Sequence, residues 1–289
     1  MPRLVRWLPL IIPVALAGGP LRAPEPPELQ WRPPLPLQGS LVVLVVRPAG
    51  PDTAPFVTGT LAGEPLHFEA DSQGRFVALG GIPLNTRDTI PVQVSVNGQE
   101  FVMPLPVAHR TVTREVLRTA PRFTRPPDSA LAVRLERERH RVREALQRTH
   151  STPRLWSAPF ARPRESQINS GFGLAREFND VVESRHLGTD FAGQQGAPVR
   201  AANRGVVALV DDLFYSGRTI YIDHGAGLLT GYLHLDRALV AAGDTVQRGQ
   251  LIGRVGATGR VTGPHLHWLA RYGAVAVDPL DLLNIDWTP

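Results

Sequence analysis

The stretch TGPHLHW, at residues 262–268, places two histidines on either side of one leucine near the end of the chain. Side chains alternate between the two faces of a β-strand. On a strand, His265 and His267 therefore share one face, with Cα atoms about 7 Å apart. One histidine can then bind a metal while the other reaches a substrate beside it. Taken alone, the pair is equally consistent with ordinary packing or hydrogen bonding of strand residues.

The sequence around this pair is rich in glycine and in short β-branched runs. Examples are PVRAANRGVVALVDD at 198–212 and RTIYIDHGAGLLTGYLHL at 218–235. Short strands separated by tight turns predict a compact, mainly antiparallel β-domain over 153–289. The histidine of GYLHL, His234, lies inside one predicted strand, and by itself it is consistent with either a structural or a functional role.

A second pair of candidate ligands occurs in RHLGTDFAG, at 185–193. His186 and Asp190 would share one face of a helix, but the glycines here disfavour a helix. On a straight strand the two residues lie about 13 Å apart, whereas each ligand of a zinc ion lies about 2 Å from it. Joint binding therefore requires a bend, which Gly188 permits. We expect a valine at Gly188 to weaken zinc binding.

Three segments together resemble the lysostaphin/LytM-type zinc endopeptidases of peptidoglycan. They are HLGTD at 186–190, IDHGAGLLTGYLHL at 222–235 and GDTVQRGQLIGRVGATGRVTGPHLHW at 243–268. SGFG at 170–173 and DPLDLL at 278–283 extend the resemblance over about 168–283. The motifs occur in the order that the family shows.

The resemblance implies a role for each matching residue. His186, Asp190 and His267 would bind one zinc ion per catalytic domain, and His234 and His265 would form an unligated catalytic pair. Two imidazoles and one carboxylate leave zinc an open position, as in catalytic sites. One histidine of the pair would move a proton and the other would stabilise the oxyanion, and the sequence leaves their order open. His224 is interpreted as structural, and Asn169 is either a latent fourth ligand or a turn residue.

Composition excludes several other kinds of site. The chain has no cysteine and no lysine, which excludes disulfides, thiolate metal sites, a cysteine nucleophile, a P-loop lysine and a lysine Schiff base. A basic and apolar start with ALA at 15–17 predicts a signal peptide over 1–17, with an uncleaved anchor as the alternative. We therefore expect an exported, periplasmic or envelope-associated protein that does not bind nucleic acid.

The N-terminal half is expected to contain three further parts. The proline-rich segment 18–38 predicts an extended spacer, and the short strand-like runs of 39–109 predict a small β-sandwich. This sandwich is expected to pack on the catalytic face and restrict access, as N-terminal regions of some relatives do. Segment 110–152 is expected to be an arginine-rich helical connector, with a helix capped by Asp128 or Ser129 and running to about Gln147.

The arginine-rich composition continues to residue 164, with 14 arginines against five acids in 110–164. This charge is interpreted either as a surface for weak contact with an anionic membrane or wall polymer, or as a solvated connecting helix. The function predicted for the whole chain is hydrolysis of peptide bonds in the stem peptides or cross-links of peptidoglycan. The alternatives are a non-catalytic wall-binding regulator that activates another hydrolase, and a wall-binding adhesion or scaffold module.

Overall fold

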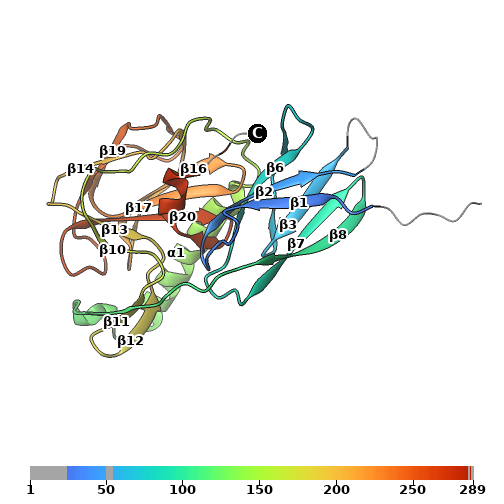
Figure 1. Ribbon diagram of the computed structural model, residues 1–289. Coiled ribbons are helices and arrows are strands. Elements are labelled where there is room, and N and C mark those ends of the chain that lie inside the picture. The colour runs from blue at the N-terminus through green and yellow to red at the C-terminus, as the bar shows by residue number, and fades with distance from the viewer. Residues whose placement is uncertain (1–24, 50–54, 286, 288–289) are drawn as a thin grey trace, which may run out of the picture.

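The computed structural model describes residues 25–49, 55–285 and 287. As predicted, the fold is mainly β. An N-terminal sandwich and a C-terminal β-domain lie side by side and are joined by a connector that contains the long helix (Figure 1). The expected signal peptide, residues 1–17, lies outside the described residues. Within the described part of the chain, no helix is both long enough and apolar enough to cross a membrane.

Two four-stranded sheets form the sandwich. The first has the order β1 (Glu28–Arg32), β2 (Leu41–Arg47), β6 (Phe76–Gly81), β5 (Glu69–Ala70), and the second has the order β4 (Glu64–Pro65), β3 (Val57–Leu61), β7 (Thr89–Val96), β8 (Gln99–Pro106). Alternate side chains of β2, including Leu44, are buried with those of β7 and with Leu61 and Leu105 between the sheets. This packing is typical of a β-sandwich.

The expectation of an extended spacer over 18–38 is wrong for its second half. Residues Glu28–Arg32 form β1, and all five pair with residues 43–47 of β2. The stretch between Pro27 and Pro33 contains no proline, so each of its residues has a backbone N–H group that can take part in pairing with β2. Trp31 packs against the sandwich core. The sandwich therefore begins about ten residues before the predicted boundary.

Strand β2 is buried on both faces, which explains its uninterrupted apolar sequence LVVLVV. The face that carries Leu41, Val43 and Val45 belongs to a second core, shared with the C-terminal domain. Gly81 lies against that domain so closely that an added Cβ would meet Tyr272 at 3.0 Å. The sandwich is therefore fused to the C-terminal domain through a common core, and it does not pack as a separate module.

Polar contacts border this shared core. Arg154 binds Glu69 through two hydrogen bonds of 2.8 and 2.7 Å. His150 lies between His67 and Glu64, at 2.8 and 2.9 Å.

At the other border, the Leu41 N–H donates to Asp281 at 2.9 Å. Burial, reinforced by the neighbouring charge of Asp278, raises the pKa of Asp281 to about 6. Ionisation of Asp281 therefore costs more free energy in the folded chain than in the unfolded chain.

We expect Asp281→Asn to stabilise the protein at pH 7.5 and to have a much smaller effect at pH 4.5. Folding raises the pKa of Asp281, so the protonated carboxyl stabilises the folded chain. This contribution is complete below the ordinary value of 3.8 and is lost as the pH rises from there through about 6. Asparagine keeps an acceptor for Leu41 and carries no charge. The expected gain is about 1–2 kcal/mol, because partial exposure reduces the full effect of roughly 3 kcal/mol. Urea denaturation at both pH values measures it, and an equal difference at the two values would contradict the assignment.

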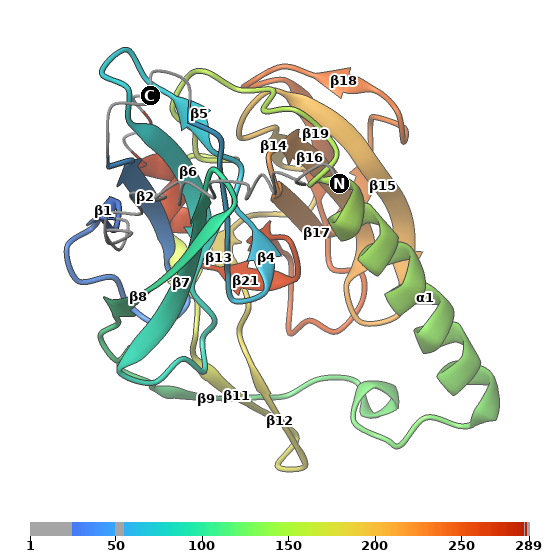
Figure 2. The ribbon, with the colours of Figure 1, turned by 90° about the vertical axis from the view of Figure 1, so that its right-hand side faces the viewer.

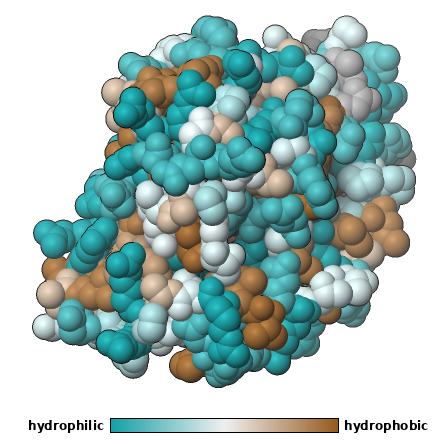
Figure 3. Space-filling view, turned by 90° about the vertical axis from the view of Figure 1, so that its left-hand side faces the viewer, coloured by the Kyte–Doolittle hydropathy of each residue, from teal (hydrophilic) through white to brown (hydrophobic). Residues whose placement is uncertain are grey.

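The C-terminal domain is built on one large antiparallel sheet. Its main path is β10 (Ile168–Ser170), β13 (Thr189–Ala192), β20 (His265–Tyr272), β17 (Leu228–Ala238), β16 (Gly217–Gly225), β15 (Gly205–Leu213), β18 (Thr245–Val246). Strand β19 (Leu251–Val255) joins β14 (Pro198–Arg200) to β17, and β21 (Val275–Val277) pairs with β20 before the 3₁₀ turn η2 (Pro279–Leu283). The end of the molecule remote from the sandwich is largely hydrophilic, with separate hydrophobic patches (Figure 3).

The connector contains the helix expected within 110–152 and, in addition, a strand that the sequence analysis did not predict. It begins with strand β9 (Arg114–Leu117), continues through a short 3₁₀ turn η1 (Pro121–Phe123), and ends in helix α1 (Ser129–Arg148). Strand β9 pairs in parallel with β11 (Ala175–Phe178), which forms a hairpin with β12 (Val182–Arg185). Figure 2 shows β9 beside β11, and α1 beside β15.

Helix α1 has the predicted start, because the Asp128 side chain accepts a hydrogen bond from the Leu131 N–H. It packs on the sheet through Leu135 and Leu146, which are buried. Several connector arginines bind acids of this chain, at 2.5–3.0 Å; they include Arg110, Arg114, Arg118, Arg134, Arg139 and Arg141. These pairs favour the interpretation of a solvated connecting helix over that of an anion-binding surface.

Candidate metal centre and active site

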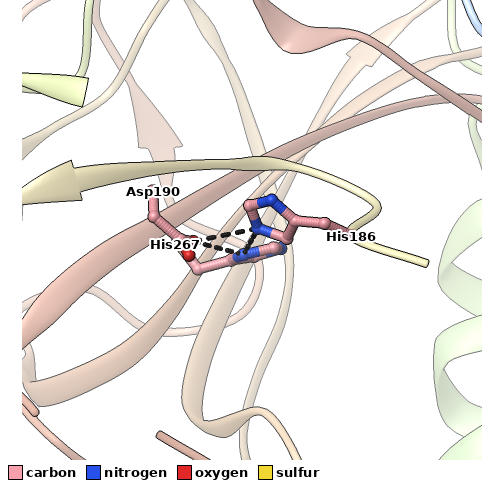
Figure 4. Close-up of side chains that lie close together, drawn as sticks. All are labelled: His186, Asp190 and His267. Atoms are coloured by element: carbon pink, nitrogen blue, oxygen red, sulfur yellow. Dashed lines mark hydrogen bonds and ion pairs between the residues drawn. The ribbon is translucent and has the colours of Figure 1, made fainter. Parts of the chain in front are cut away.

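The structure brings His186, Asp190 and His267 together, as Figure 4 shows. His186 Nε2 lies 3.1 Å from Asp190 Oδ1 and 3.0 Å from His267 Nδ1. The third distance, from His267 Nδ1 to Asp190 Oδ1, is 2.8 Å. All three residues are buried. Three candidate ligand atoms, from two distant segments of the sequence, therefore face one point.

Strand pairing and a bend produce this arrangement. Asp190 lies directly opposite His267 in the antiparallel pairing of β13 with β20. The chain leaves β12 at Arg185, bends at Gly188 and enters β13 at Thr189, so His186 turns back toward Asp190. A bend at Gly188 was predicted from the spacing, but the structure gives a further reason for glycine. A Cβ there would lie 2.6 Å from His267 Nε2 and 2.5 Å from the Trp268 carbonyl oxygen.

We expect even Gly188→Ala to weaken metal binding, because the added methyl group displaces the ring of His267. The expected loss is about 10- to 100-fold in zinc affinity, as for other changes beside a metal ligand. Competition with a chromogenic chelator measures the affinity. Gly171→Ala is the matched control, since a Cβ at Gly171 meets no heavy atom within 4 Å. Equal zinc affinity of a folded Gly188→Ala protein and the wild type would contradict the packing argument.

The three ligand atoms fit a zinc ion in spacing and in chemistry. A tetrahedral ion about 2 Å from each atom holds the atoms roughly 3.3 Å apart, close to the distances found. His186 Nδ1 donates to the Gly171 carbonyl oxygen at 2.6 Å, so Nε2 of the neutral ring keeps its lone pair. Asp190 Oδ2 accepts a hydrogen bond of 2.6 Å from Arg176, which leaves Oδ1 facing the two histidines.

The electrostatic environment favours ionisation states that bind a divalent cation. Burial alone would raise the pKa of the Asp190 carboxyl, but hydrogen bonds from His186 and His267 hold it well below its usual range. Burial lowers the pKa of His267 to about 4, although Asp190 opposes this shift. A charged carboxylate beside neutral imidazoles is the state required for metal binding near pH 7.

His265 and His234 lie beside the three ligand residues. His265 Nε2 is 3.7 Å from Asp190 Oδ1, and the ring centroids of His234 and His265 are 5.0 Å apart. His265 Nδ1 donates to the Gly263 carbonyl oxygen and His234 Nδ1 donates to that of Thr258, each at 2.9 Å. Each neutral ring therefore keeps Nε2 as its free nitrogen, available for proton transfer.

His234 occupies an irregular place in its strand. Its φ is 63°, in the left-handed region that non-glycine residues rarely adopt. The pairing of β17 with β16 shifts register between Tyr232 and Leu235, so an extra residue is accommodated there. Such a bulge re-aims a side chain, and here it places His234 beside His265. The plain strand that the sequence predicts would not have indicated this.

A groove of about 250 Å³ opens beside these histidines, and its lining includes residues from the connector. Glu115 and Leu117 of β9 line it together with Asp190, His234 and His265. The sandwich itself meets the other end of β20, at Tyr272. Among the described residues, the expected packing of the sandwich on the catalytic face is therefore wrong, because the connector strand β9, and not the sandwich, lines the groove.

Sequence reasoning missed Arg176. Its guanidinium bridges Asp190, at 2.6 Å, and Glu115, at 3.0 Å. Asn169 also lines the groove, and it lies in strand β10, so it is not the turn residue that one of the two expectations gave. His224 is fully buried, with its two ring nitrogens on the Arg204 carbonyl oxygen and the Thr230 hydroxyl.

The mainly antiparallel fold and a His–Asp–His centre with two free histidines define a metallopeptidase domain. Residues 184–279 match the sequence model of peptidase family M23, and through this domain the chain belongs to that family.

Known relatives agree with this assignment. The peptidoglycan DD-endopeptidase ShyB of Vibrio cholerae is 48% identical over 123 residues, which are 42% of this chain and 28% of ShyB. The DD-carboxypeptidase/endopeptidase Mpg of Neisseria meningitidis is 42% identical over 117 residues, which are 40% of this chain and 27% of Mpg. The chain thus covers only about a quarter of the length of these relatives.

One solved structure resembles the chain beyond the peptidase domain. A candidate M23 peptidase from Pseudomonas aeruginosa is 28% identical, with a TM-score of 0.66, and the match covers 86% of this chain and 95% of that one. So wide a match includes much of the sandwich and connector as well as the residues of the family model.

Proposed function

We propose that the chain is an exported zinc metallo-endopeptidase that hydrolyses peptide bonds in the stem peptides or cross-links of bacterial peptidoglycan. The main support is the convergence of His186, Asp190 and His267 within 3.1 Å of one another, beside two histidines with a free Nε2. The names of relatives in the same family, which include peptidoglycan DD-endopeptidases, point to the substrate.

In this proposal His186 Nε2, Asp190 Oδ1 and His267 Nδ1 hold the zinc ion. Bound zinc would supply Lewis-acid polarisation of the scissile carbonyl and lower the pKa of a water molecule. His234 and His265 provide the proton transfer and the stabilisation of the oxyanion. One accepts a proton from the attacking water and passes it to the leaving nitrogen, while the other, protonated, donates to the developing oxyanion. Arg176 holds Asp190 in its orientation.

Purified full-length protein should contain close to one zinc per chain and should release peptides from peptidoglycan sacculi. Mass spectrometry of defined cross-linked muropeptides identifies the bond that is cut. A chelator should stop the reaction and added zinc should restore it. Zinc-loaded protein that binds sacculi and leaves every muropeptide intact would instead identify the non-catalytic regulator, and protein without zinc would favour an adhesion or scaffold module.

The proposed export rests on the sequence of residues 1–17 and on the location of the substrate outside the cytoplasm. Cell fractionation tests it directly. Recovery of the protein in the cytoplasmic fraction, with residue 1 retained, would contradict export.

A further inference from the structure

Arg260 lies in the loop that leads into β20, and aromatic rings rather than carboxylates flank its guanidinium. Its Cζ lies 4.1 Å from the centre of the Phe178 ring and 5.0 Å from that of Tyr215. The Arg260 N–H donates to the Tyr215 carbonyl oxygen at 2.8 Å, which anchors the loop. Burial lowers the pKa of Arg260; Tyr215 acts in the opposite direction, and the nearby charge of Arg176 adds to the lowering. No carboxylate of the described residues contributes to the shift.

The two arginines that line the groove, Arg176 and Arg260, differ in whether a carboxylate neutralises their charge. Arg176 is neutralised by Glu115 and Asp190, at 3.0 and 2.6 Å. Arg260 lines the same groove as His234 and His265, and it pairs with no carboxylate in the described part of the chain. A partly buried guanidinium without an acid is unusual, because burying a charge is costly unless it is paired.

We propose that Arg260 binds a free carboxylate of the peptide substrate. Rings that cover the face of a guanidinium leave its N–H edge available, and that edge matches a carboxylate through two parallel hydrogen bonds. The position in the groove places the carboxylate close to the scissile bond. This inference rests on the proposed function and narrows the substrate class.

Two kinds of peptidoglycan cross-link, the D-Ala–diaminopimelate bond and the glycine bridge, differ in whether a free carboxylate lies beside the scissile bond. In a D-Ala–diaminopimelate cross-link, the carbon that bears the scissile nitrogen also carries a free carboxylate. A D-Ala–D-Ala end has the same arrangement. In a glycine bridge, the corresponding carboxyl is consumed in the next peptide bond. Arg260 thus favours D-Ala–diaminopimelate cross-links and D-Ala–D-Ala ends over glycine bridges.

The test compares diacetyl-L-Lys-D-Ala-D-Ala with its C-terminal amide, by NMR titration of the metal-free full-length chain. The free acid should bind about 10- to 100-fold more tightly than the amide, the effect of one hydrogen-bonded charge pair. Arg260→Gln should lose this preference and bind both peptides as the wild type binds the amide. Arg248→Gln, which removes an equal charge from an exposed turn away from the groove, is the control and should keep the preference.

Equal binding of acid and amide by the wild type would overturn the inference, and this comparison needs no variant to fold. A folded Arg260→Gln protein that weakens both peptides equally would also overturn it, since that result indicates a structural role. Hydrolysis of muropeptides by the zinc-loaded chain is measured separately. A carboxylate preference without hydrolysis would refute the proposed function alone, and hydrolysis without the preference would refute the carboxylate site alone.

Discussion

Alanine in place of His267 is expected to remove bound zinc and hydrolytic activity together. His267 Nδ1 is the third candidate ligand atom, and it lies 2.8 Å from Asp190 Oδ1 and 3.0 Å from His186 Nε2. Without it, two side chains remain, fewer than the three protein ligands of a catalytic zinc site. The fall in zinc affinity should exceed the 10- to 100-fold that changes beside a ligand produce. Elemental analysis and a peptidoglycan turbidity assay on the same preparation measure both effects.

The control for this prediction is the thermal stability of the variant without added metal. His267 is buried against the bend at Gly188, so its loss leaves a cavity and some destabilisation is expected. Metal loss counts only in protein that remains folded, as shown by circular dichroism. A folded His267→Ala protein that keeps one zinc per chain would show that the ligand set is wrong.

Local sequence patterns were sufficient to predict the main features of the C-terminal domain. The alternation in HLH predicts that His265 and His267 share a face, and the spacing of His186 and Asp190 requires the bend that the structure has at Gly188. What joins the two segments is the register of β13 against β20, which sets Asp190 opposite His267. That register depends on long-range pairing and has no signature within either segment.

Other features of the site were not predictable for two physical reasons. The backbone carbonyl groups of Gly171, Thr258 and Gly263, which fix the imidazole tautomers, have no residue-specific signal. Arg176 and Arg260 belong to a chain in which every basic residue is arginine, so residue type alone did not distinguish them. Only the three-dimensional contacts separate these two from the other arginines.

The N-terminal boundaries failed where tertiary pairing overrides local composition. Residues 28–32 look like part of a proline-rich spacer, yet they complete a sheet edge beside β2. Segment 114–117 looks like the start of a basic connector, yet it pairs with β11 and lines the groove. In both cases a short segment gains its structure from a distant strand, which a window of sequence cannot reveal.

His265→Ala is expected to give the opposite combination to His267→Ala, with zinc retained and turnover lost. His265 contributes none of the three close ligand atoms, and its Nε2 lies 3.7 Å from Asp190 Oδ1, within reach of a substrate in the groove. Removing a group that transfers a proton typically lowers the rate 10²- to 10⁴-fold. Zinc content should stay near one per chain, and kcat should fall much more than KM rises.

His234 should behave in the same way, but its backbone requires a different substitution. Asparagine tolerates the left-handed conformation at φ 63° better than most residues, so His234→Asn removes the ring while keeping the bulge. We expect this variant to bind zinc as the wild type does and to lose activity within the same 10²- to 10⁴-fold range. If His265→Ala loses its zinc while His267→Ala retains it, the two roles are reversed. If His265→Ala and His234→Asn both keep full activity, the two histidines are strand-packing residues and the proposed proton transfer is wrong.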